Sequence, residues 1–153
     1  MTNASFTGKT ALISGGASGI GLATAQRLIS QGATVWIADI QDTLGQQIAE
    51  EIGANYLHLD VAKEEEWTSA VELIAGQGQG LHLLMNNAGI AIGGTLETQT
   101  TAEFLQTINI NLLGVFLGCK VCAPVLAFSG GGSIVNVSSI WGMVSDPGIN
   151  SYS

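Results

Sequence analysis

A glycine-rich segment near the N-terminus constrains the fold more than any other feature of the sequence. Residues 14–21, SGGASGIG, follow an apolar, β-branched run at 10–14 and lead into an amphipathic helical pattern. Glycine lets the backbone turn sharply off a strand and bring N–H groups close to a phosphate, and the N-terminus of the next helix carries about half a positive charge. The segment therefore predicts a dinucleotide phosphate site, although its spacing is GxxxGxG rather than GxGxxG. An ordinary tight turn between strand and helix is the alternative.

Strand and helix patterns alternate along the rest of the chain. We expect strands at 10–14, 34–38, 56–59, 81–85 and 133–137, and a long helix that starts at a capping box of Thr100 and Glu103 and reaches about Phe128. This alternation predicts an α/β fold, a doubly wound parallel sheet of the Rossmann type with strand order 3-2-1-4-5. Ile20, Ala23 and Leu28 are expected on the inner face of the first helix. No linker divides the sequence, so residues 1–153 are expected to form a single dinucleotide-binding domain.

Composition narrows the classes of partner. The chain is 46% hydrophobic and only 10% charged, which fits a sheet buried on both faces. Its net charge is −8 with four basic residues, so it cannot form the basic stripe of a nucleic-acid surface. No apolar run reaches the roughly 18 residues that a membrane span needs, and residues 1–9 lack the apolar core of a signal peptide. We therefore expect a cytoplasmic protein without a membrane or nucleic-acid partner.

The two cysteines, Cys119 and Cys122, have the CxxC spacing of some redox and zinc sites. They fall inside a helical pattern, and no second cysteine or histidine pair lies nearby in the sequence. Buried thiols are therefore the preferred interpretation, and no metal site is expected.

Asp39 ends the second expected strand, 18 residues after Gly21. Dinucleotide sites carry an acid about 20 residues after the glycines, where it accepts hydrogen bonds from the adenosine ribose. A carboxylate there repels a 2′-phosphate, and no Arg or Lys lies near residues 15–21 or directly after Asp39. The sequence therefore favours NAD(H) over NADP(H). A loop or helix-cap acid is the alternative role of Asp39.

Other small and polar residues also collect at strand ends, where parallel sheets bind ligands. Asp60 and Val61 are candidates for contacts to adenine, although Asp60 fits nearly as well as an acid ahead of the third helix. The small residues of 87–89, NAG, would let a ribose approach the backbone, whereas Asn86 is a candidate for tying neighbouring strands together.

Together these motifs resemble the short-chain dehydrogenase/reductase family. The resemblance rests on SGGASGIG, Asp39, DV at 60–61, NNAG at 86–89, Asn111, VSS at 137–139 and Tyr152, and it covers essentially the whole chain. Ser14 stands where the family usually has threonine, but the hydroxyl is kept. The resemblance implies cofactor contacts from Gly15, Ser18, Gly19, Ile20, Gly21, Asp39, Ile40, Asp60, Val61, Asn87, Ala88, Gly89 and Tyr152.

The same resemblance implies a catalytic set of Asn111, Ser139 and Tyr152, the last 13 residues after the serine. The implied reaction transfers a hydride between NAD(H) and a secondary alcohol or ketone. Tyr152 would be the general acid/base, Ser139 would hydrogen-bond the substrate oxygen, and a carbonyl near Asn111 would hold a water in a proton relay. Taken singly, a packing tyrosine, a capping serine and a solvated asparagine are the alternatives.

One departure from the family limits what this sequence predicts. The family carries a lysine four residues after the tyrosine, which lowers the tyrosine pKa and binds the ribose. The sequence ends at Ser153, so we expect a C-terminally truncated form with little or no catalysis and doubtful autonomous folding. The resemblance implies that the full-length form is a homo-oligomer, a dimer or a tetramer. Ile92, Trp141, Met143 and Val144 suggest an apolar substrate, although they also suit packing.

Two other functions remain as alternatives. Without the lysine, the chain could be an inactive NAD-binding fragment or sensor. A serine hydrolase built on Ser138 or Ser139 is disfavoured, because the sequence lacks a GxSxG elbow and His58 and His82 fall inside strand patterns.

Overall fold

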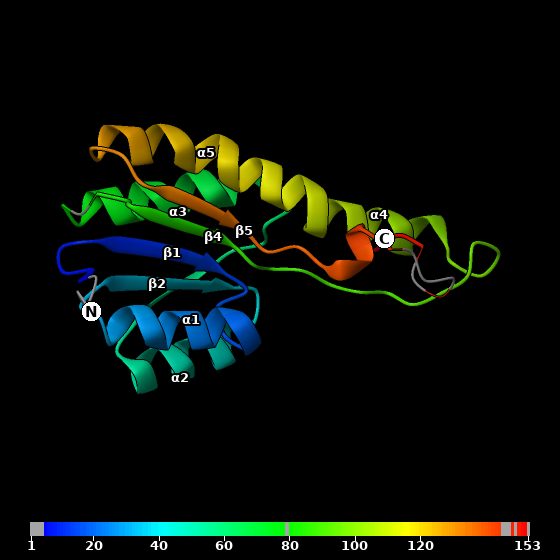
Figure 1. Cartoon of the computed structure of the whole chain (residues 1–153), viewed down its shortest axis with the longest axis horizontal. Coiled ribbons are helices and arrows are strands. Elements are labelled where there is room, and N and C mark those ends of the chain that lie inside the picture. The colour runs from blue at the N-terminus through cyan, green and yellow to red at the C-terminus, as the bar shows by residue number, and fades with distance from the viewer. Residues whose placement is uncertain (1–4, 79, 145–147, 149, 153) are drawn as a thin grey trace.

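The computed structural model describes residues 5–78, 80–144, 148 and 150–152. Its centre is one parallel five-stranded sheet in the order β3-β2-β1-β4-β5, which confirms the predicted fold class and strand order (Figure 1). The strands are β1 (Thr10–Ser14), β2 (Thr34–Asp39), β3 (Asn55–His58), β4 (Leu83–Asn86) and β5 (Ser133–Asn136). Their bounds agree with the expected ones to within two residues at each end.

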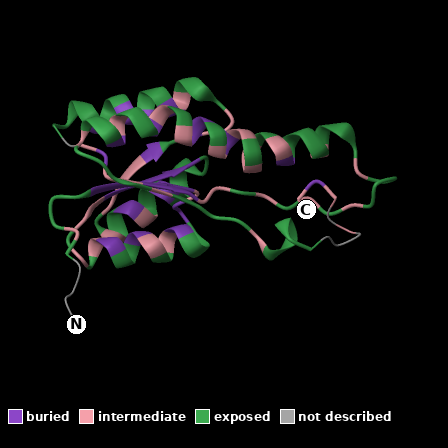
Figure 2. Cartoon of the chain, turned by 45° about the horizontal axis from the view of Figure 1, so that its top comes forward, coloured by how far each residue is buried: buried purple, intermediate pink, exposed green. Residues whose placement is uncertain are grey.

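Helices cover both faces of the sheet (Figure 1). The elements α1 (Gly19–Ile29) and α2 (Asp42–Ile52) lie on one face, and α3 (Glu64–Gly76) and α5 (Gly114–Phe128) lie on the other. Successive strand residues point to opposite faces, so Leu12 packs into one core cluster with Trp67, whereas Ala11 and Ile13 pack into the other. Figure 2 shows that the buried residues gather in the sheet and on the helix faces turned toward it.

The buried face of α1 differs from the predicted one. Gly21, Ala25 and Leu28 are buried, whereas Ile20 is 63% exposed and Ala23 is also exposed. The prediction is confirmed for Leu28 and wrong for Ile20 and Ala23, because hydrophobicity alone chose Ile20, while the close approach of α1 to the sheet selects the small residues Gly21 and Ala25. Ile20 is thereby left at the carboxyl edge of the sheet.

The long helix begins at the predicted capping box. Glu103 N donates to Thr100 Oγ1 at 3.2 Å, and Thr100 N donates to Glu103 Oε2 at 2.8 Å. The helix is interrupted, however: α4 (Thr101–Ile108) passes through a π-helical turn, η1 (Asn109–Leu113), before α5. Nothing in the sequence patterns predicted this turn.

The joined helix Thr101–Phe128 is 28 residues long with a mean hydropathy of 1.9 in its most apolar window. By length and composition this helix could cross a membrane, which the search of the sequence for an apolar run of about 18 residues did not detect. Core helices pass the same test, and α5 packs here against α3 and β4 with Leu117, Cys122 and Leu126 buried.

Candidate active site

A cavity of about 560 Å³ opens at the carboxyl ends of the strands. It is lined by every residue predicted to contact the cofactor except Gly21, namely Gly15, Ser18, Gly19, Ile20, Asp39, Ile40, Asp60, Val61, Asn87, Ala88, Gly89 and Tyr152. A second cavity of about 200 Å³ adjoins it and is lined by Asn111, Ser139 and Tyr152. The fold thus brings the cofactor candidates and the catalytic candidates to one edge of the sheet.

The glycine turn is held in place by the end of β4. Asn87 Nδ2 donates to the carbonyl oxygens of Ser14 and Gly15, both at 3.0 Å, and Ser14 Oγ accepts from the N–H groups of Asn87 and Ala88 at 3.0 and 3.1 Å. Gly15 has φ +63°, and a Cβ there would lie 2.9 Å from Ala88 Cα. The Asn87 side chain therefore supports the turn, and only glycine fits at position 15.

Gly21 packs against Gly15 and Asn87 and does not line the larger cavity. A Cβ on Gly21 would lie 2.5 Å from Gly15 O and 2.7 Å from Asn87 Nδ2. The absence of a side chain lets the first turn of α1 lie directly against the glycine turn. Gly21 is therefore required by the shape of the site, although it does not line the cavity.

The N-terminus of α1 suits an anion. Ser18 is the N-cap, its side chain makes no capping hydrogen bond, and the first turn holds no acidic residue. Ser18, Gly19 and Ile20 line the larger cavity, so the helix begins at the cavity wall. Backbone N–H groups and the helix dipole together favour a phosphate at such a position.

Asp39 lies at the end of β2 and is 8% exposed. Its Oδ2 accepts from Ala17 N at 3.3 Å, and its Oδ1 accepts from Gln41 N at 3.1 Å. Oδ1 also accepts from Gln41 Nε2 at 3.5 Å, whereas Oδ2 keeps a further lone pair for a ligand. The Tyr56 hydroxyl, 2.8 Å from Asp39 O and 2.7 Å from Asp42 Oδ1, links the end of β2 to the start of α2.

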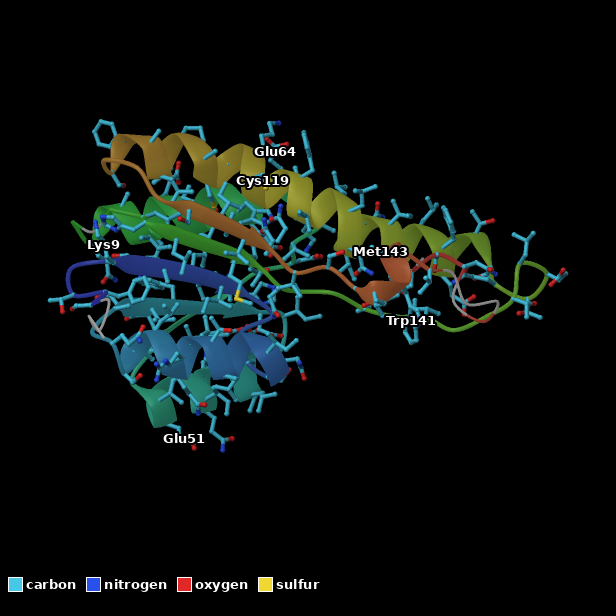
Figure 3. All side chains as sticks on the ribbon, in the orientation of Figure 1. Lys9, Glu51, Glu64, Cys119, Trp141 and Met143 are labelled. Carbon is cyan, nitrogen blue, oxygen red and sulfur yellow. The ribbon has the colours of Figure 1, made fainter. Side chains whose placement is uncertain are left out.

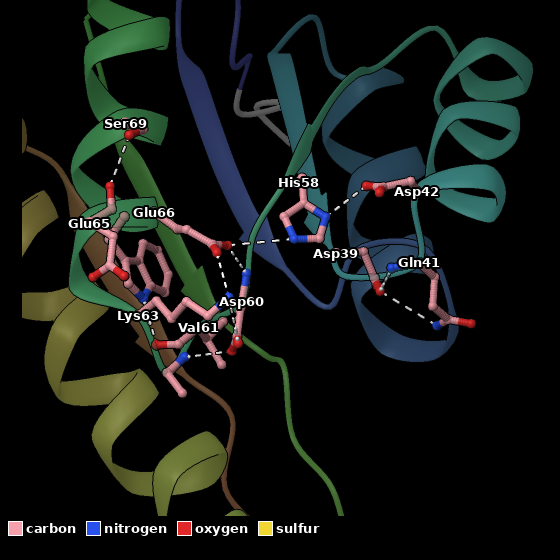
Figure 4. Close-up of polar contacts among 12 residues, drawn as sticks. Asp39, Gln41, Asp42, His58, Asp60, Val61, Lys63, Glu65, Glu66 and Ser69 are labelled. Carbon is pink, nitrogen blue, oxygen red and sulfur yellow. Dashed lines mark hydrogen bonds and ion pairs between the residues drawn. The ribbon is translucent and has the colours of Figure 1, made fainter.

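A group of charged side chains surrounds the adjacent strand end (Figure 4). His58 Nδ1 lies 2.8 Å from Asp42 Oδ1, and its Nε2 lies 3.7 Å from Glu66 Oε2. His58 is the last residue of β3 and His82 directly precedes β4, so the expectation that both lie within strands and away from their ends was wrong. Both ring nitrogens of His58 face carboxylates. The hydrogen bonds from Tyr56 and His58 hold the pKa of Asp42 below its usual range.

Asp60 has features of both of its predicted roles. It lines the larger cavity, while its Oδ1 accepts from Ala62 N at 3.1 Å and its Oδ2 lies 3.4 Å from Lys63 Nζ (Figure 4). Its backbone N donates to Glu66 Oε2 at 2.6 Å. These bonds belong to the start of α3, and the carboxylate remains at the cavity wall.

The three catalytic candidates are fixed by different local structures. Ser139 Oγ accepts from Trp141 N at 3.2 Å and caps the 3₁₀ turn η2 (Ile140–Gly142). The Tyr152 and Trp141 rings pack edge to face, with centroids 5.8 Å apart and an interplanar angle of 81°. Asn111, inside η1, accepts from Ile90 N at 2.9 Å and donates to Ile90 O at 2.7 Å. Asn111 therefore ties the loop after β4 to the π-helical turn.

Sequence reasoning missed several residues that hold this region together. They are Gln41, Tyr56, Gln99, Thr107 and Ser151. Gln41 contacts Asp39, two residues away, whereas each of the others acts through a contact between segments far apart in the sequence, and no spacing rule links such partners. The predicted role of Asn86 is confirmed, because Asn86 Nδ2 donates to Asn136 Oδ1 at 2.8 Å and joins β4 to β5.

The cysteines lie on α5, where Cys119 is partly exposed and Cys122 is buried. Burial, followed by the neighbouring Cys119, raises the pKa of the Cys122 thiol to about 12. Within the described residues, no three His, Cys, Asp or Glu side chains are grouped to hold a metal ion.

Comparison with known proteins identifies the family of this chain. The profile of the short chain dehydrogenases matches residues 9–153, and the chain therefore belongs to that family. It is 40% identical over 147 residues to a 3-alpha-(or 20-beta)-hydroxysteroid dehydrogenase of Mycobacterium bovis, covering 95% of this chain and 56% of that protein. It is 39% identical over 149 residues to a cyclopentanol dehydrogenase of Comamonas testosteroni, covering 94% of this chain and 60% of that protein.

The fold has a solved counterpart in the crystal structure of gox2181, with a TM-score of 0.93 and 27% sequence identity. That alignment covers 98% of this chain and 62% of the other. The chain thus spans less than two thirds of the length of each of these relatives.

Proposed function

We propose that the protein containing this chain is an oxidoreductase that transfers a hydride between NAD(H) and a secondary alcohol or ketone. The observation that carries the proposal is the shared wall of two adjoining cavities. Tyr152 and residues 87–89 line both, so the catalytic candidates Asn111 and Ser139 lie next to the dinucleotide candidates Gly15 and Asp39. A binding module without chemistry would not require the second group of residues.

The larger cavity has features that fit a dinucleotide. The notch at Gly15, which a Cβ would fill, and the uncapped N-terminus of α1 suit a pyrophosphate. The carboxylate of Asp39, which accepts from Ala17 N just before that helix, suits the two hydroxyls of an adenosine ribose and disfavours a 2′-phosphate. Asp60 and Val61 would border the adenine. We therefore propose NAD(H), in preference to NADP(H), as the cofactor.

When bound, the nicotinamide ring supplies the hydride acceptor or donor. Tyr152 would take the proton from an alcohol oxygen in oxidation and return it to the carbonyl oxygen in reduction. Ser139 Oγ, already placed by Trp141 N, would hydrogen-bond the same substrate oxygen and stabilise charge that develops there. Asn111 holds Ile90 at the cavity wall. A carbonyl near Asn111 would hold a water molecule that relays the proton.

The apolar character of the segment after Ser139 supports an apolar substrate. Ile140 is 69% exposed and Met143 is 85% exposed, and Trp141 and Met143 lie beyond the carboxyl ends of the strands (Figure 3). The names of two relatives, a hydroxysteroid dehydrogenase and a cyclopentanol dehydrogenase, describe enzymes of cyclic secondary alcohols. We propose a substrate of this class.

The remaining proposals concern the setting of the enzyme. The net charge of −8 supports a protein that does not bind nucleic acid, and the family resemblance supports a cytoplasmic enzyme without a membrane partner. Exposed apolar side chains along the long helix, including Leu112 at 64% and Phe116 at 58%, support a homo-oligomer.

The decisive experiment combines binding and turnover on the longest form of the protein that its gene encodes. NADH and NADPH are titrated in parallel, and cyclopentanol is then offered with NAD. We expect NADH to bind more tightly than NADPH and cyclopentanol to be oxidised. Tighter NADPH binding would overturn the assignment to Asp39. Tight NADH binding without turnover of cyclopentanol would favour the alternative, an NAD-binding sensor.

A further inference from the structure

Three buried or half-buried side chains, those of Gln99, Ser151 and Thr107, form a hydrogen-bonded network. Ser151, the residue before Tyr152, is 8% exposed, and Thr107 on α4 is fully buried. Gln99 Nε2 donates to Ser151 Oγ at 2.7 Å, and the Ser151 hydroxyl donates to Thr107 Oγ1 at 3.2 Å. Three segments that are distant in sequence therefore meet at one serine hydroxyl.

These hydrogen bonds run in one direction and end at a backbone carbonyl of α4. The Thr107 hydroxyl donates to Glu103 O at 3.1 Å, so each hydroxyl both donates and accepts. Glu103 is itself part of the capping box that begins α4. Gln99 Nε2 also lies 3.3 Å from Ile92 O, so the same amide links the loop after β4 to Ser151. A polar network satisfied in this way specifies one arrangement of the segments that it joins.

Two further hydrogen bonds, one between backbone groups and one from a side chain, run beside this network. Gly94 N donates to Gly148 O at 2.8 Å, and Asn150 Nδ2 donates to Gly94 O at 3.1 Å. The loop after β4 and the segment that carries Tyr152 are thus joined at several points. The ring of Tyr152 packs edge to face against Trp141, and this is its one aromatic contact among the described residues.

We propose that Gln99, Thr107 and Ser151 are positioning residues for Tyr152: they fix the backbone of its segment so that the phenol lies at the wall shared by the two cavities. Tyr152 lies outside every helix and strand, so side-chain contacts must do for it what strand β2 does for Asp39. This inference rests on the proposed function for its catalytic consequence. Its structural content, the placement of Tyr152, is independent of the reaction.

The first test measures NAD-dependent oxidation of cyclopentanol by the longest form of the protein. Ser151→Ala, Gln99→Met and Thr107→Val each remove hydrogen-bonding capacity with little change in charge. A misplaced general acid/base lowers turnover far more than binding, so we expect kcat to fall about tenfold to a hundredfold with the Kd for NADH unchanged. None of the three side chains titrates, so the pH profile of kcat should keep its apparent pKa, and only the maximum value of kcat should fall.

Two variants serve as controls. Thr107→Ser keeps the hydroxyl and should restore most of the kcat that Thr107→Val loses. Gln106→Met makes the same chemical change as Gln99→Met at an exposed position of α4, and its kcat should equal that of the unmodified protein. The proposal is overturned if Ser151→Ala leaves kcat unchanged, or if kcat and NADH affinity fall together in all three variants, which would indicate a purely structural role.

A second test needs no turnover. 3-Fluorotyrosine is placed at position 152 in one sample and at position 56 in another, and ¹⁹F spectra are recorded with and without Ser151→Ala. We expect the signal from position 152 to shift or split and that from position 56 to stay the same. Unchanged spectra at both positions contradict the inference. If the unmodified protein oxidises no alcohol, the proposed function fails and this spectrum alone decides the positioning role.

Discussion

The two sides of the candidate site are built by different means. On the cofactor side, Ser14, Asp39 and Asn87 lie at the ends of adjacent strands, and the backbone of the sheet fixes their positions. On the reaction side, Ser139 and Tyr152 belong to a segment beyond β5 whose described part contains only one short 3₁₀ turn (Figure 1). Side-chain hydrogen bonds and one aromatic contact hold that segment.

The difference suggests how tolerant each side is of change. Sheet geometry is a cooperative property, so substitutions on the cofactor side should affect stability and cofactor affinity together. On the reaction side a single side chain can be changed with the sheet intact, so turnover should fall by itself. The predictions below test this separation, beginning with the largest effect.

Tyr152→Phe should reduce kcat for alcohol oxidation by about 10²-fold to 10⁴-fold, because it removes the group that exchanges a proton with the substrate oxygen. The Kd for NADH should change less than about threefold, because the substitution keeps the aromatic ring and leaves the other predicted cofactor contacts in place. Steady-state kinetics and a fluorescence titration on the same preparation measure the two quantities. A parallel loss of NADH affinity would show that the two sides are not separable.

Gly21→Ala should damage the cofactor side. Its Cβ would lie 2.5 Å from Gly15 O, where backbone cannot move aside cheaply, so we expect a loss of about 1–3 kcal/mol in the free energy of unfolding. NADH affinity should fall at least about tenfold, because the glycine turn must shift.

Gly76→Ala is the matched control. A Cβ there meets no atom within 4 Å and φ is not positive, so stability should be unchanged or rise by about 0.5 kcal/mol. Denaturant unfolding measures both variants. Equal stability of Gly21→Ala and Gly76→Ala would contradict the packing role of Gly21.

Asp39→Asn should alter the preference between NADH and NADPH, with a smaller effect than those of Tyr152→Phe and Gly21→Ala. It keeps the shape and one acceptor oxygen but removes the charge that opposes a 2′-phosphate. We expect NADH to bind about tenfold more weakly and the preference for NADH over NADPH to narrow by a similar factor. Parallel titrations with both nucleotides measure this ratio, and an unchanged ratio would assign Asp39 a purely structural role.

The smallest predicted effect concerns His82, at the opposite end of β4 from the site. Burial, with a further contribution from the charge of Lys9, lowers the pKa of His82 below 6.5, and its neutral Nδ1 accepts from Thr10 N at 3.1 Å. Because the folded state disfavours protonation, the contribution to stability is full above pH 6.5 and declines as the pH falls below it.

His82→Asn cannot be protonated, so its Tm should fall less than that of the unmodified protein between about pH 7 and pH 5, by about 2 °C. Cofactor affinity should be the same in both proteins across this range, since His82 is remote from the cavities. Thermal melts at matched ionic strength measure the difference. A steeper decline in the variant would reverse the sign of the argument.

The sequence allowed much of the fold and the residues of both cavities to be predicted. Apolar runs of strand length separated by helical patterns indicate a parallel sheet, and such a sheet brings the residues after each strand to one edge. Gly15, Asp39, Asn87, Ser139 and Tyr152 were chosen by order and spacing, and all of them line the cavities. Their assigned roles in binding and catalysis stay predictions.

The details that support the site were decided by the tertiary structure. Hydrophobicity placed Ile20 in the core, but the close contact of α1 with the glycine turn buries Gly21 instead. The π-helical turn at Asn109–Leu113 and the link from Gln99 through Ser151 to Thr107 follow no periodic pattern. Local patterns report which face of a segment prefers water, whereas contacts between distant segments depend on how those segments pack, and only the folded chain determines that.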